Sequence, residues 1–204
     1  MPIHLPTGNP VRHTAMLLVV LGLSAGAVPA EPPPPLELTE EEEATLASGE
    51  VVSRVDVEQI PASSVGVIDV SVPPERLWEA VFDFQARAEE QRSIKAADVY
   101  EGPAGQLAVR WTVGVAGVKT IFHTLYYPDL DQGWCPWELD DTKDNDLNST
   151  VGSYQVYAVD GESRLVYRGR SDPGRRTPMW LRRWLATESM KNQLEGFKRR
   201  AEGG

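Results

Sequence analysis

The stretch VGVIDVSVPPERLWEAVF, residues 65–82, contains a transition from a strand to a helix. Residues 65–72 are rich in β-branched side chains, which favour a strand. Pro73-Pro74 ends that strand, and proline fits the first turn of a helix. Four large apolar residues then share one face at helical spacing: Leu77, Trp78, Val81 and Phe82. The stretch therefore predicts a strand that runs directly into an amphipathic helix.

The flanking sequence predicts further elements on both sides of this stretch. Before it, Thr39 and four glutamates indicate a helix N-cap with acids in the first turn, and the helix would end at Ser48. A short strand is expected over residues 51–57. After it, we expect a second helical segment near residues 85–92 and a C-terminal helix over residues 178–202. Between these helices lie six expected antiparallel strands: 96–101, 106–115, 118–127, 134–140, 149–159 and 163–170.

Two turn signals predict which strand residues share a face. Ala116-Gly117 suits a two-residue turn that places Trp111 opposite Phe122. Asp160-Gly161 suits a type I′ turn that places Tyr154 opposite Tyr167. Because directly opposed residues share a face, each hairpin has one apolar face carrying several hydroxyls. These faces comprise Leu107, Val109, Trp111, Val113, Val115, Val118, Thr120, Phe122, Thr124 and Tyr126 in the first hairpin, and Tyr154, Val156, Ala158, Ser163, Leu165 and Tyr167 in the second.

Composition excludes several classes of function. The chain has 204 residues, with 20 basic and 30 acidic side chains and a formal net charge of −10. This balance argues against nonspecific nucleic-acid binding, which needs a cationic surface. A single cysteine, Cys135, excludes an internal disulfide framework and a Cys-rich zinc site. His123 would lie opposite Arg110, on the face away from the apolar residues, where a general base would be badly placed. The sequence therefore indicates no cofactor, no metal site and no catalytic residue.

The N-terminal segment is typical of a protein that is exported. Residues 15–28 are apolar or small and follow Arg12, and no acidic residue precedes Glu31. This pattern predicts a signal peptide over residues 1–30, the alternative being a short buried helix. A proline- and glutamate-rich spacer with a short helix would occupy residues 31–49, and a ligand-binding domain residues 50–204. A periplasmic or secreted location follows from this interpretation.

The order of elements predicts an α+β fold in which a curved antiparallel sheet wraps around the C-terminal helix. Residues 50–202 resemble the START-like superfamily, also called SRPBCC, Bet v 1-like or polyketide cyclase/dehydrase-like, which has the helix-grip fold. The resemblance lies in Val67–Trp78, Trp137–Leu139, Gly152–Val156 and the final helix after Asp172-Pro173-Gly174. Among its subgroups, the chain is similar to the coenzyme-Q-binding START proteins found among exported bacterial proteins.

This resemblance implies a cavity between sheet and helix that binds a lipid, an isoprenoid quinone or a sterol-like molecule. An apolar face with scattered hydroxyls is consistent with such a pocket. A polyketide cyclase or aromatase that uses tyrosine or a carboxylate remains an alternative, as does an interaction module with a filled core. Whether the protein is an enzyme stays open, with binding alone favoured. The expected lining residues are Val109, Trp111, Val113, Thr120, Phe122, Thr124, Tyr126, Trp137, Tyr154, Val156, Leu165, Tyr167, Trp184, Met190 and Leu194.

Basic residues concentrate near the C-terminal helix, beside Trp180 and Trp184. Basic groups next to tryptophans favour peripheral contact with an anionic membrane. The alternative is that these arginines pair with acidic groups of the protein itself. The residues concerned are Arg168, Arg170, Arg175, Arg176, Arg182 and Arg183.

Overall fold

The computed structural model describes residues 31–115, 117–174, 177 and 179–203. The expected signal peptide, residues 1–30, lies outside the described residues. The elements are α1 (Glu40–Ala47), β1 (Val52–Asp56), β2 (Ala62–Val70), α2 (Pro74–Phe82), α3 (Phe84–Glu90), β3 (Ile94–Glu101), the 3₁₀ helix η1 (Pro103–Gly105), β4 (Leu107–Val115), β5 (Val118–Tyr126), β6 (Trp134–Leu139), β7 (Ser149–Val159), β8 (Glu162–Asp172), α4 (Met179–Ala186) and α5 (Glu188–Glu202).

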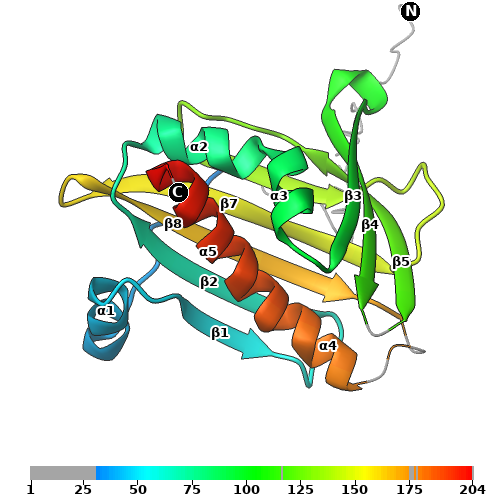
Figure 1. The fold of residues 1–204 in the computed structure, drawn as a ribbon, viewed down its shortest axis with the longest axis horizontal. Coiled ribbons are helices and arrows are strands. Elements are labelled where there is room, and N and C mark those ends of the chain that lie inside the picture. Colours follow the sequence, from blue (N-terminus) through cyan, green and yellow to red (C-terminus); the bar gives the residue numbers. More distant parts are fainter. Residues whose placement is uncertain (1–30, 116, 175–176, 178, 204) are drawn as a thin grey trace, which may run out of the picture.

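The described strands form one antiparallel sheet of eight strands in the order β1-β2-β8-β7-β6-β5-β4-β3. Figure 1 shows α4 and α5 running across one face of the curved sheet, with α2 and α3 beside them. This arrangement confirms the expected α+β fold of the helix-grip type. The candidate site lies between the sheet and the C-terminal helices.

Both hairpin registers expected from the turn signals are confirmed. Trp111 pairs with Phe122, and Tyr154 pairs with Tyr167. In the second turn, Asp160 and Gly161 both have positive φ, as a type I′ turn requires. The hairpins therefore turn the expected residues toward the same face of the sheet.

The C-terminal helix differs from the expectation of one continuous helix over residues 178–202. It is divided at Thr187, which lies between α4 and α5. The Thr187 hydroxyl donates a hydrogen bond of 2.8 Å to the carbonyl oxygen of Arg183, one turn earlier. A threonine hydroxyl that bonds back to the preceding turn competes with the backbone and bends a helix, which the apolar spacing alone does not reveal.

Hydrophobic clusters lie on both faces of the sheet. On the face toward α5, Ile68 and Leu165 are fully buried together with Leu77 of α2 and Phe197 of α5. On the opposite face, a smaller cluster joins Leu46 of α1 to residues of the sheet, namely Val52, Val67 and Val166. The large cluster therefore fixes α5 against the sheet, and the small one anchors the N-terminal helix.

The N-terminal helix α1 begins as its sequence predicts. The Thr39 hydroxyl accepts a hydrogen bond from the Glu42 backbone, and the Glu42 carboxylate accepts one from the Thr39 backbone, which completes a capping box. Glu43 and Asp69 both pair with Arg164 of β8, at 2.8 and 2.7 Å. These ion pairs attach α1 to the face of the sheet opposite α5.

Candidate functional site

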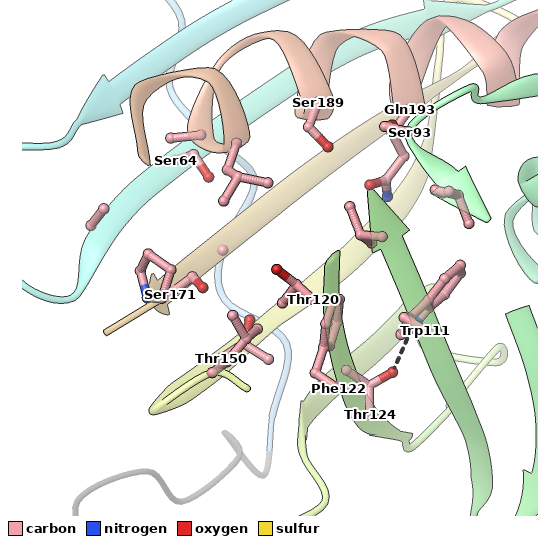
Figure 2. Close-up of a pocket in the computed structure, with 18 of the residues that line it drawn as sticks. Ser64, Ser93, Trp111, Thr120, Phe122, Thr124, Thr150, Ser171, Ser189 and Gln193 are labelled. Carbon is pink, nitrogen blue, oxygen red and sulfur yellow. Dashed lines mark hydrogen bonds between the residues drawn. The ribbon is translucent and has the colours of Figure 1, made fainter. Parts of the chain in front are cut away.

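A cavity of about 170 Å³ lies between the inner face of the sheet and the C-terminal helices. Figure 2 shows Ser189 and Gln193 projecting from α5 toward Thr120 and Trp111 on the sheet side. A cavity of about 150 Å³ accommodates a molecule the size of benzene. The cavity volume is therefore sufficient for a single ring or a short alkyl chain.

The structure brings most of the expected site residues together around this cavity. The expected residues that line it are Trp111, Val113, Thr120, Phe122, Thr124, Tyr126, Trp137, Tyr154 and Tyr167. The remaining expected residues lie elsewhere. Val109, Val156, Leu165, Met190 and Leu194 belong to the hydrophobic core, and Trp184 lines a separate hollow beside Glu90 and Asn192. Contact of any of these side chains with a ligand stays a prediction.

Several lining residues were absent from the expectations. They are Val115 and Val118 at the hairpin end, Arg87, Ser93 and Ile94 near α3, Arg182, Leu185, Ala186, Ser189 and Gln193 on the C-terminal helices, and Ala62, Ser64, Leu147, Thr150, Gly169, Ser171 and Pro173 around one end of the sheet. One signal was present: Gln193 interrupts the apolar stripe of Met190, Leu194 and Phe197. Arg87 had no such signal, because only tertiary packing brings α3 to the cavity.

The cavity has a buried end and an end at the surface. At the buried end, Trp111 and Tyr154 are each 3% exposed and Gln193 is 5% exposed. At the other end, Val118 is 45% exposed. Val118 therefore marks a part of the lining that reaches the surface.

Polar and apolar side chains both line the cavity, and the polar groups at its buried end are joined by hydrogen bonds. The indole nitrogen of Trp111 donates a hydrogen bond of 2.9 Å to the Thr124 hydroxyl, which Figure 2 marks with a dashed line. Arg87 of α3 donates 2.6 Å to the Gln193 side-chain oxygen, and the Gln193 amide nitrogen donates 2.5 Å to the Tyr154 hydroxyl. Hydrogen-bonding groups among apolar side chains are characteristic of a ligand site.

The cavity tyrosines are unsuited to act as general bases. Burial raises the pKa of Tyr126, Tyr154 and Tyr167 above its ordinary value. All three phenols therefore stay protonated near neutral pH, where they can donate hydrogen bonds but do not accept protons. Such phenols are therefore hydrogen-bond donors in the lining.

The other candidate groups lie outside the cavity. His123 pairs with Arg110 in the sheet, and its ring nitrogen Nδ1 lies 3.2 Å from the Asn145 side-chain oxygen. Cys135 is fully buried, and burial raises the pKa of its thiol to about 12. Within the described part of the chain, no cluster of three or more His, Cys, Asp or Glu side chains could hold a metal ion.

The arginines expected to form one basic surface occupy separate places. Arg168 and Arg170 lie on β8, and Arg168 donates a hydrogen bond of 2.9 Å to the Gln155 side chain. Arg182 lines the cavity and donates to the carbonyl oxygens of Thr177 and Gly174. Arg183 is exposed on α4, and Arg175 and Arg176 lie outside the described residues. Of the helices in the described ranges, none has the length and hydrophobicity needed to cross a bilayer.

An antiparallel sheet wrapped around a C-terminal helix, with an apolar cavity between them, defines the START-like or SRPBCC class of helix-grip proteins. Within that class, residues 61–202 match the family described as polyketide cyclase / dehydrase and lipid transport, and the chain belongs to this family. No curated protein has significant similarity to this chain.

Solved structures share the fold at low sequence identity. The Xanthomonas axonopodis STAR-related lipid transfer protein aligns with a TM-score of 0.58 at 13% identity, over 74% of this chain and 93% of that one. The ZhuI aromatase/cyclase of a Streptomyces species gives 0.57 at 17% identity, over 74% and 94%. Human STARD10 gives 0.56 at 12% identity, over 78% and 77%. At these identities the likeness concerns the fold alone.

Proposed function

We propose that this protein binds a hydrophobic small molecule in the cavity between the sheet and α5, and carries or stores it without chemical change. The observation that supports this most directly is the cavity itself, which is lined by apolar and aromatic side chains and closed at one end by buried rings. The family to which the chain belongs includes lipid transport in its description. Apolar lining with a few polar anchors is the usual design of such sites.

The proposal extends to export and to the chemistry of the cargo. The apolar segment at residues 15–28 supports secretion or residence in the periplasm. Lipids, isoprenoid quinones and sterol-like molecules are the cargo classes suggested by the resemblance. Since the enclosed volume is about 170 Å³, only part of such a molecule would fit, and the rest would extend past Val118.

Ligand binding is testable with a variant that fills the cavity. Ser189→Leu adds a larger side chain on the lining face of α5, and Lys191→Leu adds the same side chain on the exposed face of that helix. Titration with a fluorescent apolar probe, together with native mass spectrometry of the purified protein, should show binding to the wild type and to Lys191→Leu. Binding to Ser189→Leu should fall by about tenfold or more. Absence of probe binding and of any co-purifying apolar molecule from the wild type would contradict the proposal.

A second candidate function is that of a cyclase or aromatase acting in the same cavity. The observation in its favour is that Arg87 and Tyr154 place hydrogen-bond donors at the buried end, where they could polarise a substrate carbonyl. Tyr154→Phe and Tyr167→Phe together should then abolish turnover of a poly-β-ketone substrate while binding persists. Unchanged turnover in the double variant would eliminate Tyr154 and Tyr167 from this chemistry.

We also propose that α4 contacts an anionic membrane during ligand exchange. Met179 and Trp180 are 57% and 54% exposed, and Arg183 is exposed on the same helix. Apolar side chains next to a cation suit the interface of an anionic bilayer. Flotation with phosphatidylglycerol vesicles should recover the wild type, and Trp180→Ser with Arg183→Ser should reduce that recovery. Equal recovery with zwitterionic vesicles would contradict an electrostatic contribution.

A further inference from the structure

The buried end of the cavity contains a cation without a carboxylate partner. The guanidinium of Arg87 lies over the Trp111 ring, 4.5 Å from its centroid. Among the ion pairs of the described residues, none involves Arg87, whereas Arg200 pairs with Glu90 and Arg164 pairs with Glu43 and Asp69. Arg87 is half-buried, with its Nε atom buried, and a partly desolvated charge without a counter-charge is unfavourable. A ligand that carries a negative charge would compensate Arg87.

The hydrogen bonds around Arg87 leave donor hydrogens without acceptors. Gln193 uses its side-chain oxygen to accept from Arg87 and its amide nitrogen to donate to the Tyr154 hydroxyl. The Tyr154 oxygen also accepts from Arg87 at 3.4 Å, and its hydroxyl donates no hydrogen bond among the described residues. The Nε hydrogen of Arg87 likewise has no partner in the described part of the chain. A bound group must therefore supply acceptors.

Arg182, the other cation in the described lining, is held by the backbone rather than by side chains. Its Nε and Nη2 donate to the backbone carbonyl oxygens of Thr177 and Gly174, at 3.0 and 2.8 Å. These bonds hold Arg182 in the segment that leads into α4. Both guanidiniums make two hydrogen bonds, but those of Arg87 go to neutral side chains at the end lined by Trp111 and Tyr154, and its buried Nε has no partner among the described residues.

The remaining lining combines apolar side chains with hydroxyls. Val113, Val115, Phe122 and Leu185 supply apolar surface, and Thr120 and Ser189 are among the hydroxyl residues. The volume of about 170 Å³ is enough for a single ring or a short alkyl chain. The charge of Arg87, the free donors beside it and the apolar walls of the cavity together favour a small amphipathic ligand.

We propose that the cavity binds a small amphipathic carboxylate, with the carboxylate held by Arg87 and Tyr154 and the apolar body directed toward Val118. This inference rests on the proposed function, since it names the ligand class of the same cavity. Arginine and a protonated phenol are suited to a carboxylate because charge-assisted hydrogen bonds are stronger than neutral ones.

The test compares octanoate with 1-octanol, which have equal chain lengths and differ in charge. Isothermal titration calorimetry should show that the wild type binds octanoate about tenfold or more tightly than 1-octanol. Arg87→Met should abolish this preference while 1-octanol binds within about threefold of the wild type. Arg182→Met is the matched control and should keep the preference. Arg87→Lys should retain part of it, which guards against a variant that fails to fold.

The possible results separate this inference from the proposed function. Equal binding of the two ligands by the wild type, or tighter binding of 1-octanol, overturns the assignment of a carboxylate but leaves hydrophobic binding intact. Retained preference in Arg87→Met overturns the role of Arg87. Binding of the apolar fluorescent probe without binding of octanoate also overturns this inference alone. Failure of the wild type to bind octanoate, 1-octanol and the probe overturns the proposed function.

Discussion

Gln193 of α5 accepts a hydrogen bond of 2.6 Å from Arg87 of α3 through its side-chain oxygen. This contact leaves the Gln193 amide nitrogen to face the Tyr154 hydroxyl, to which it donates. The Gln193 side chain thus connects α5 to both α3 and β7 at the buried end of the cavity. The same contact leaves the Tyr154 hydroxyl hydrogen without an acceptor among the described residues.

Gln193→Leu should destabilise the protein by about 1–3 kcal/mol, because Arg87 and Tyr154 both lose a buried partner. Urea unfolding followed by tryptophan fluorescence measures this change. Ser189→Ala, also on the lining face of α5, is the control and should change stability by less than about 0.5 kcal/mol. Equal unfolding midpoints for Gln193→Leu and the wild type would show that the hydrogen bonds contribute nothing.

Gly66→Ala should weaken the packing of α5 on β2. A methyl group at Gly66 would lie 2.6 Å from a Leu194 methyl carbon and 2.8 Å from the Met190 sulfur. Both side chains are buried, so relief requires the helix to shift, at a cost of about 1–3 kcal/mol. Thermal unfolding should show the loss.

Gly114→Ala is the matched control for this substitution. Its nearest neighbour would be the Lys95 side chain at 3.0 Å, and a flexible lysine can move aside. The prediction fails if the two glycine variants unfold at the same temperature.

Acid should weaken the attachment of α1 through Glu42. Hydrogen bonds from the Arg54 side chain and the Thr39 backbone lower the pKa of Glu42 from 4.5 to about 2. Because the folded pKa lies below the unfolded one, the stabilisation is complete above about pH 4.5 and is lost as the pH falls through 2. Glu42→Gln should therefore be less stable than the wild type near neutral pH, and the difference should shrink toward about pH 2.

Urea midpoints measured across this pH range provide the comparison for Glu42. Glu41→Gln, an exposed change in the same helix with no ion pair in the structure, is the control. A wild-type advantage over Glu42→Gln that is constant down to about pH 2 would show that the carboxylate is not the responsible group.

The Cys135 thiol should be inert in the folded protein. It is fully buried, and burial raises its pKa to about 12, so almost no thiolate is present near neutral pH. Iodoacetamide at about pH 8 should modify the protein only in denaturant, as measured by intact mass. Rapid modification without denaturant would show that β6 opens to solvent.

The hairpin signals were local, and for that reason they predicted much of the site. Asp160-Gly161 occupies a turn in which both residues need positive φ, and this turn sets the pairing of Tyr154 with Tyr167. Alternation then assigns each neighbouring residue to a face of the sheet. The aromatic lining contributed by β4, β5 and β7 follows from these short-range rules.

The C-terminal helices were less predictable because an apolar stripe does not distinguish core from cavity. Met190 and Leu194 were expected in the lining but pack in the core, close to Gly66. Gln193 lies between them in sequence and reaches the cavity instead. A rotation of one residue along a helix changes the direction of a side chain by about 100°, and only packing against β2 sets that rotation.

The sequence by itself determined the order of elements, the register of both hairpins and which strand residues lie on the apolar face of the sheet. Each of these depends on contacts between near neighbours, whose geometry a turn or a periodicity specifies. Only the tertiary structure decided that Arg87 of α3 meets Gln193 and Tyr154 at the closed end of a cavity. These residues lie far apart along the chain, and no local rule determines how a helix packs across a curved sheet.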